Sequence, residues 1–154
     1  MNYTQTIKQF ERNPDKKGAV RLNDMLNSYK RPIKSQDNPI IYKTFVKSFS
    51  PMQLGLTVIN SGAINKEFYM TRGHIHKKPT PEFYILLEGS GLLLIQKGKP
   101  KIIKLKKGEI ALIPENYAHR LINTGNKKLK VLTIYHEDSQ PNYKVKFKKR
   151  FFKK

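Results

Sequence analysis

The sequence predicts an all-β fold, a β-sandwich or barrel, in a chain of 154 residues that suits one domain. Short apolar runs alternate with polar residues at the two-residue period of a β-strand. Turn signals, most of them containing glycine, separate these runs at close and regular intervals, as in sandwiches and barrels. The expected strands are Ile40–Val46, Gln53–Asn60, Glu67–Met70, Glu82–Leu87, Leu92–Gln96, Lys101–Leu105, Glu109–Ile113, His119–Asn123 and Leu129–Tyr135.

The two ends of the chain carry weaker patterns than the strands between them. Residues 1–18 are polar and predict an irregular arm, whereas apolar residues at helical spacing predict a short helix over Val20–Tyr29. We therefore expect a single domain in three parts: an N-terminal arm with a short helix (1–39), a barrel core (40–135) and a basic C-terminal tail (136–154).

Composition excludes several classes of protein. No apolar stretch approaches the ~20 residues that a membrane-spanning helix needs, and the first residues lack the hydrophobic centre of a signal peptide. We therefore expect a cytoplasmic protein with no membrane partner. The chain has no cysteine, so disulfides and thiolate metal ligands are excluded, and any metal must be bound by histidine, carboxylate and water.

The formal charge of +20 has three interpretations. Clustered cations could bind nucleic acid, above all in the tail after Tyr143, or the charge could attract a small anionic substrate. The third interpretation is a general preference for lysine, which supplies 25 of the 31 basic residues. We favour the third, because arginine, the usual side chain that reads bases and phosphates, is scarce.

Two short segments look like the halves of one metal site. His74 and His76 are two residues apart, Glu82 opens the next expected strand, and His119 follows later. Residues i and i+2 of a strand face the same side, so both imidazoles of the first pair can point into one barrel. Imidazole and carboxylate bind divalent iron, manganese, nickel or zinc. A lone His-x-His is more often an ordinary hydrogen-bonded pair, but these four residues at fixed offsets favour a metal site.

The offsets also resemble the two sequence motifs of cupins. The first is Gly73-His74-Ile-His76, five residues, Glu82, six residues and Gly89; the second is Gly108, five residues, then Pro114-Glu-Asn116-Tyr-Ala-His119, three residues and Asn123. The resemblance implies a cupin β-barrel, that is, a double-stranded β-helix or jelly roll. Cupins usually carry glycine where this chain has Asn116, and asparagine accepts left-handed backbone angles better than most residues.

A narrower resemblance is to the cupin-type, or archaeal-type, glucose-6-phosphate isomerases. It rests on the run Glu67-Phe-Tyr-Met-Thr71-Arg-Gly73-His74-Ile-His76, on Glu82-Phe-Tyr84 and on Tyr117-Ala-His119-Arg-Leu-Ile-Asn123-Thr-Gly125, and it spans most of the chain. This resemblance implies metal ligands, catalytic residues and a sugar-phosphate site. The implied ligands are His74, His76, Glu82 and His119, the catalytic residues are Glu82, Tyr84 and His119, and the substrate-binding residues are Tyr42, Thr57, Thr71, Gly73 and Tyr135.

The chemistry of these side chains agrees with the implied reaction, which interconverts glucose 6-phosphate and fructose 6-phosphate. An enediol route needs a base at carbon and stabilisation of oxyanion charge, and a bound metal can supply the latter. Glu82 is the candidate base, although metal binding weakens it, so a metal-assisted hydride shift stays open. Four protein ligands would close a tetrahedral zinc site, so iron, manganese or nickel suits catalysis better than zinc.

Two other functions remain open. Another metal-dependent cupin, such as a dioxygenase, would use the same ligands on a different substrate. A non-catalytic cupin could bind nucleic acid through its basic tail. Pro141 stands where the isomerases tend to carry histidine. Tyr84 and His136 are candidate proton relays, although for His136 we favour an ordinary loop histidine. We also expect a homodimer, because a small barrel leaves strand edges that need covering.

Overall fold

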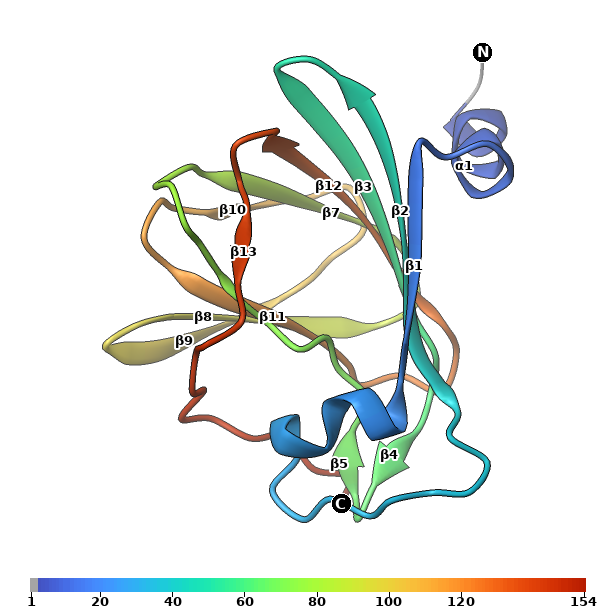
Figure 1. Cartoon of the computed structure of the whole chain (residues 1–154), viewed down its shortest axis with the longest axis vertical. Helices are drawn as coiled ribbons and strands as arrows, with labels where there is room; N and C mark the ends of the chain where they lie inside the picture. Colours follow the sequence, from blue (N-terminus) through green and yellow to red (C-terminus); the bar gives the residue numbers. More distant parts are fainter. Residues whose placement is uncertain (1–2) are drawn as a thin grey trace.

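The computed structural model describes residues 3–154, with side chains described for residues 7–154. Two β-sheets face each other and enclose the interior (Figure 1). In the larger sheet the strands are ordered β1 (Lys16–Arg21), β2 (Ile40–Phe49), β3 (Met52–Ile59), β12 (Leu129–His136), β7 (Glu82–Glu88) and β10 (Ile110–Ile113). In the smaller sheet they are ordered β11 (Ala118–Asn123), β8 (Gly91–Lys97) and β9 (Lys99–Lys104).

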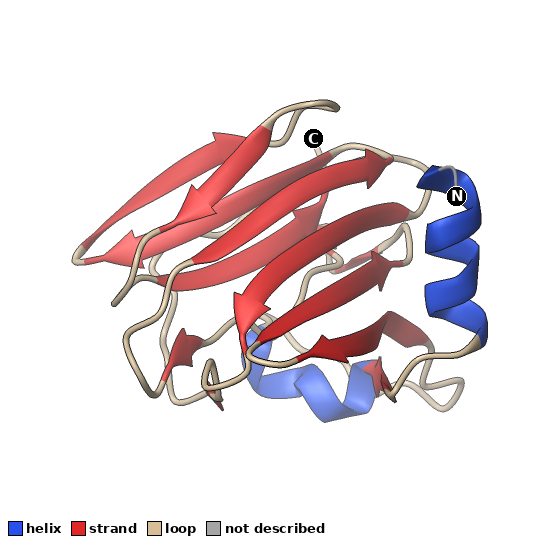
Figure 2. Cartoon of the chain, turned by 90° about the horizontal axis from the view of Figure 1, so that it is seen from above, coloured by secondary structure: helices blue, strands red, loops and turns tan. Residues whose placement is uncertain are grey.

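Two short strand pairs complete the fold. They are β4 (Ala63–Ile64) with β5 (Glu67–Phe68), and β6 (Ile75–His76) with β13 (Pro141–Asn142). Strands dominate the chain, as Figure 2 shows, and the all-β prediction is confirmed. Every expected strand overlaps an observed one. The strand expected over Glu67–Met70 is shorter, because pairing ends at Phe68 and Met70 makes only an isolated bridge with Ile122.

The prediction of an irregular arm over residues 1–18 is wrong for most of its length, and its first two residues lie outside the described part of the chain. Helix α1 (Tyr3–Arg12) lies outside the larger sheet beside β1 and β2 (Figure 1). Its Ile7 and Phe10 belong to an apolar cluster that also contains Leu56 and Leu87. Strand β1 pairs with β2 although nearly all its side chains are exposed. Backbone hydrogen bonds to β2 hold this edge strand in place. Because its side chains bury little surface, the sequence of β1 shows no alternation of apolar and polar residues.

The short helix expected over Val20–Tyr29 is present as the 3₁₀ helix η1 (Leu22–Ser28). Leu22 and Met25 are buried, and the Asp24 carboxylate accepts the backbone N–H of Arg21 at 3.0 Å, which caps the first turn. No helix within residues 3–154 is long and apolar enough to span a membrane.

Alternation along β7 decides which side chains reach the interior. Glu82 and Tyr84 are buried and face inward, whereas Phe83 between them is exposed on the outer face. The neighbouring strands keep this register, since Tyr135 pairs with Glu82 and Thr133 with Tyr84. Their polar side chains therefore lie on the same inner face, which places hydroxyl and carboxylate groups inside the barrel.

The basic C-terminal segment packs back onto the barrel. Phe147 is buried against the core, the N–H of Phe68 donates to the carbonyl of Phe151 at 3.1 Å, and the Arg150 guanidinium forms an ion pair with the buried Glu67 carboxylate at 3.0 Å. These contacts close the end of the barrel next to η1.

Candidate metal centre and substrate pocket

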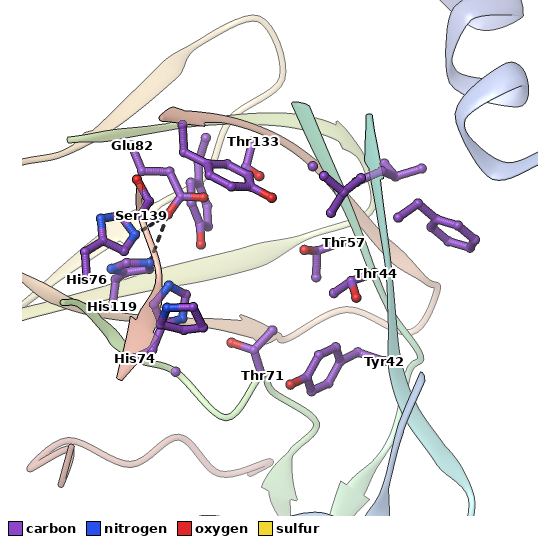
Figure 3. A pocket seen from close by; sticks show the side chains of 18 of the residues that line it. Tyr42, Thr44, Thr57, Thr71, His74, His76, Glu82, His119, Thr133 and Ser139 are labelled. Atoms are coloured by element: carbon purple, nitrogen blue, oxygen red, sulfur yellow. Dashed lines mark ion pairs between the residues drawn. The ribbon is translucent and has the colours of Figure 1, made fainter. Parts of the chain in front are cut away.

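Three histidines and one carboxylate converge in the interior of the barrel. His74, His76, Glu82 and His119 each offer one ligand atom, and these atoms lie within 4.8 Å of one another. Figure 3 shows them together on one wall of a pocket, with dashed lines from the Glu82 carboxylate to the imidazoles of His76 and His119. The structure thus brings together the four side chains that the resemblance implies as ligands. Their ligand role remains a prediction.

Backbone pairing fixes the relative positions of the histidines. The N–H of His74 donates to the carbonyl of His119 at 3.0 Å, and the N–H of His119 donates to the carbonyl of His74 at 2.8 Å. This reciprocal pair joins the segment before β6 to β11. It sets the rings of His74 and His119 4.3 Å apart between centroids, and extended backbone turns His76 toward the same side.

The outer nitrogens of two rings are held by carbonyl oxygens. His76 Nδ1 lies 2.8 Å from the carbonyl of Thr80, and His119 Nδ1 lies 3.2 Å from the carbonyl of Tyr117. A carbonyl can only accept, so each Nδ1 donates to its carbonyl, and Nε2 of each ring faces the cluster, where it can bind a cation. Metal-binding histidines are oriented by partners of this kind.

Two polar atoms of the cluster lack a hydrogen-bond partner in the described part of the chain. Glu82 Oε2 lies 3.1 Å from His119 Nε2 and 3.3 Å from His76 Nε2. Glu82 Oε2 and His119 Nε2 are nonetheless buried without a hydrogen-bond partner among the residues that the structure describes. Buried polar atoms rarely remain unsatisfied. A divalent cation would satisfy both at once, so the donor set fits such an ion.

The pKa values of the cluster reflect burial and mutual contacts. Burial lowers the pKa of the His74 imidazole to about 3, and the neighbouring His119 adds to this effect. Burial opposes ionisation of Glu82, but contacts with His119 and His76 outweigh it and lower the pKa of the carboxyl to about 2. The carboxylate is therefore ionised, and His74 is neutral, at neutral pH, as metal binding requires.

Hydroxyl groups form the opposite wall of a cavity of about 200 Å³. In Figure 3 the side chains of Tyr42, Thr44, Thr57 and Thr71 lie across the cavity from the histidines. All the side chains and the glycine that the resemblance implies for substrate binding and catalysis line this cavity. They are Tyr42, Thr57, Thr71, Gly73, Glu82, Tyr84, His119 and Tyr135.

The hydroxyl groups are available as donors. The Thr71 hydroxyl oxygen accepts the N–H of Leu121 at 3.1 Å, which leaves its own O–H to donate. Burial raises the pKa of Tyr42 and of Tyr135 to about 12 and raises the pKa of Tyr84 well above its usual value. All three phenols therefore keep their protons at neutral pH and can donate to anionic oxygens.

Two left-handed backbone positions shape the pocket. Gly73 has φ +72°, and a β-carbon there would lie 2.6 Å from the Phe147 ring and 2.9 Å from Arg120 Cβ. Only glycine fits this position. Asn116 has φ 65°, so asparagine adopts the left-handed conformation in the turn before β11, as its sequence position predicts.

Sequence reasoning missed four lining residues that carry hydroxyl groups, and one of its candidate proton relays lies elsewhere. Thr44, Thr133, Ser139 and Tyr143 also line the cavity. Thr44 and Thr133 lie two residues from Tyr42 and Tyr135 on the same strands, so alternation could have identified them. Ser139 and Tyr143 follow the last long strand and carried no such signal. His136 is absent from the described lining, whereas Pro141 belongs to it.

Comparison with known proteins identifies the family. Residues 34–152 match the family model described as glucose-6-phosphate isomerase (GPI). The chain belongs to this glucose-6-phosphate isomerase family. The glucose-6-phosphate isomerase of Thermococcus litoralis is 32% identical over 151 aligned residues, which cover 90% of this chain and 79% of that protein. The resemblance found in the sequence is therefore confirmed for this family member.

Solved structures show the same fold at low identity. A cupin-2 domain from Rhodospirillum rubrum matches with a TM-score of 0.52 and 12% identity, covering 71% of this chain and 68% of that chain. An oxalate decarboxylase from Lactobacillus farciminis matches with a TM-score of 0.54 and 17% identity, covering 67% of this chain and 30% of the decarboxylase. These likenesses concern the fold alone, and they confirm the cupin barrel for this glucose-6-phosphate isomerase family member.

Proposed function

We propose that this chain is a metal-dependent aldose–ketose isomerase that interconverts glucose 6-phosphate and fructose 6-phosphate. One observation carries the proposal. In a member of the glucose-6-phosphate isomerase family, a His₃Glu cluster and a wall of hydroxyl groups face each other across one cavity. Such a cavity can hold the two ends of one small molecule by different chemistry.

His74, His76, Glu82 and His119 would hold one divalent ion, for which iron, manganese or nickel is proposed ahead of zinc. When bound, such an ion acts as a Lewis acid and stabilises negative charge on the sugar oxygens. The chain's own residues prepare that position, because the Thr80 and Tyr117 carbonyls hold the rings with Nε2 facing inward.

The phosphate group is assigned to the hydroxyl wall. Thr57, Thr71 and Tyr42 can donate O–H groups to phosphate oxygens, and Gly73 leaves room for close approach to the backbone. No lysine or arginine is among the described residues that line this cavity. Attraction of the doubly charged substrate is therefore assigned to the field of the whole chain, whose formal charge is +20.

Glu82 is proposed as the base that moves the proton between C1 and C2. It is the single carboxylate among the described lining residues, and its low pKa keeps it ionised. Tyr84, buried beside it with a raised pKa, can donate a hydrogen bond to a sugar oxygen. Turnover in deuterium oxide tests this route. Proton transfer introduces solvent deuterium at the isomerised carbon. Full retention of the substrate hydrogen would contradict proton transfer by Glu82 and indicate a hydride shift.

A coupled assay tests the function itself. Purified protein stripped with EDTA and reloaded separately with iron, manganese, nickel or zinc should convert fructose 6-phosphate to glucose 6-phosphate. Glu82→Gln should abolish turnover, and Glu109→Gln, on an exposed side chain outside the pocket, should preserve it. Oxygen consumption by the ferrous protein without isomerisation would favour a dioxygenase. Metal binding with neither activity would favour a binding module.

We also propose a homodimer formed at β10. This edge strand of the larger sheet carries no charged residue in Ile110–Ile113, and its outward Ile110 and Leu112 are exposed beside Phe83 of β7. The edge strand β9, by contrast, carries three lysines, which discourage strand pairing. An uncharged edge with an apolar flank suits isologous contact with a second copy.

Light scattering during gel filtration tests this interface. The wild-type chain should run as a dimer, Leu112→Lys as a monomer, and Ile102→Lys as a dimer. The last variant is a matched control, because Ile102 on β9 is 46% exposed and Leu112 is 48% exposed. A monomeric wild-type chain, or a dimeric Leu112→Lys variant, would rule this interface out.

A further inference from the structure

A second cavity, of about 760 Å³, lies behind the substrate pocket and plays no part in the proposed isomerisation. It is enclosed by η1, by Arg72 and Arg120, and by the C-terminal segment, whose last residues run beside η1 in Figure 1. Its described lining holds one carboxylate, Asp24, and five basic side chains. These are Arg72, Arg120, Lys144, Lys146 and Arg150, and we refer to the space as the arginine cavity.

Arg120 is the most unusual group in this lining. Its side chain is only 5% exposed, its guanidinium carbon lies 4.2 Å above the Phe147 ring, and its Nε and Nη2 both donate to the carbonyl of Arg72. Among the residues that the structure describes, no carboxylate forms an ion pair with it. The Glu67 carboxylate, which favours the charged form of Arg120 without contacting it, is already paired with Arg150. A buried charge that lacks its own counterion is costly, so an anion in the cavity would be favourable.

The other two arginines retain unused donors. Arg150 uses Nη1 for the Ser28 carbonyl and the Glu67 carboxylate, and Arg72 uses Nη2 for the Asp24 carbonyl. Their remaining guanidinium N–H groups have no hydrogen-bond partner among residues 7–154. The Asp24 carboxylate already accepts the Arg21 N–H as the cap of η1. The cavity therefore offers donors and positive charge with little competing negative charge.

We propose that the arginine cavity binds a small anion that carries a phosphate group. Guanidinium groups match phosphate oxygens in pairs of parallel hydrogen bonds, which lysine does not provide. The buried Arg120 favours a compact anion that enters the cavity over an extended polyanion such as nucleic acid, which would need exposed cations. This inference concerns a site separate from the isomerase pocket and does not depend on the isomerase activity.

The occupant would share a wall with the substrate pocket. Tyr143 lines both cavities, and its ring lies 5.8 Å from the His74 ring and 5.9 Å from the Arg72 guanidinium carbon. Arg72 also precedes Gly73, which lines the substrate pocket. An anion held by Arg72 would thus contact the segment that leads into His74 and His76.

Titration calorimetry with inorganic phosphate tests the proposal on the full chain, loaded with metal, at physiological salt. We expect a site that binds one phosphate per chain and that is unchanged in Thr57→Val, which removes a hydroxyl group of the isomerase pocket alone. The triple variant Arg72→Gln, Lys144→Gln, Lys146→Gln should weaken binding by about tenfold or more, since it removes charge-assisted contacts. Arg120 and Arg150 are left intact because they support the fold.

The matched control is the triple variant Lys99→Gln, Lys101→Gln, Lys104→Gln. It removes the same charge from exposed positions on β9 and should bind phosphate as the wild-type chain does. An equal loss of phosphate affinity in both variants would show that net charge alone causes the effect, and it would overturn the proposed site. So would loss of binding in Thr57→Val, absence of binding in the millimolar range, or preferential displacement of phosphate by a labelled single-stranded oligonucleotide with a steep salt dependence. Because heat rather than turnover is measured, an inactive enzyme would not mimic any of these results.

Discussion

His119 Nε2 lies 3.1 Å from Glu82 Oε2, and both atoms are buried with no hydrogen-bond partner among the described residues. The two residues come from different sheets, β11 and β7, so the closure of the barrel brings them together. In His76 and His119 the ring nitrogen that faces away from the cluster has a carbonyl partner, whereas the nitrogen that faces inward does not. This arrangement is what a cation site requires before the ion binds.

Removal of one imidazole should therefore affect metal binding more than folding. We expect His119→Ala to lower the affinity for manganese by more than the roughly 10–100-fold that loss of an outer hydrogen-bond partner costs. Titration calorimetry on EDTA-stripped protein measures the affinity. His136→Ala is the control, since His136 is the one histidine outside the cluster. Equal affinities of the two variants would remove His119 from the ligand set.

Gly73→Ala should destabilise the fold by about 2–5 kcal/mol. Left-handed backbone costs a residue with a side chain about 1–2 kcal/mol, and crowding against Phe147 and Arg120 adds about 1–3 kcal/mol. Gly98→Ala isolates the backbone cost, because Gly98 has φ +79° and a β-carbon there meets nothing within 4 Å. Urea unfolding measures the free energy of unfolding of both variants. Similar losses of stability would contradict the expected cost of crowding at Gly73.

The ion pair between Arg150 and Glu67 should attach the C-terminal segment to the barrel. Arg150→Met leaves the Glu67 carboxylate, which is 2% exposed, with the Lys30 N–H as its one hydrogen-bond partner among the described residues, so we expect a loss of about 3 kcal/mol. The double variant Glu67→Gln, Arg150→Met should recover part of that loss, because no charge remains buried. A double variant less stable than Arg150→Met would contradict this account.

The metal-free protein should lose stability as the pH falls below neutrality. Burial, reinforced by His119, lowers the pKa of His74 from its ordinary value of 6.5 to about 3. Between these values the unfolded chain binds a proton that the folded chain excludes, so the free energy of unfolding falls as the pH drops from about 6.5 toward 3. The pKa of His76 is raised, since its contacts with Glu82 and Thr80 outweigh burial, and it contributes with the opposite sign.

The test is therefore the difference between the wild-type chain and His74→Asn, measured by urea unfolding at pH 7, 6 and 5 in EDTA. The variant should show a smaller loss of stability over this range. A loss as large as that of the wild-type chain would contradict the assigned role of His74.

Local patterns predicted the strands and much of the site. Alternation identified β7 as a strand that begins at Glu82, and fixed offsets linked Glu82 to His74, His76 and His119. The hydroxyl-bearing substrate residues came from the family resemblance, and the structure places them all around one cavity. Their roles in binding and catalysis remain predictions.

Features that depend on distant contacts were not predictable. Strand β1 is held by backbone pairing with β2, and its exposed side chains resemble those of a polar arm. The C-terminal segment is rich in lysine, yet Phe147 is buried and Arg150 pairs with Glu67. The arginine cavity draws its lining from segments far apart in the sequence. The local periodicity of a sequence does not show which distant segments come into contact.

The most direct test of the central claim is turnover measured against metal occupancy in the same samples. Protein stripped of metal is reloaded with increasing amounts of manganese, bound metal is measured by elemental analysis, and isomerisation of fructose 6-phosphate is followed in parallel. The account predicts no turnover at zero occupancy and a linear rise to one ion per chain. Full turnover in metal-free protein, or none at full occupancy with manganese, iron or nickel, would contradict it.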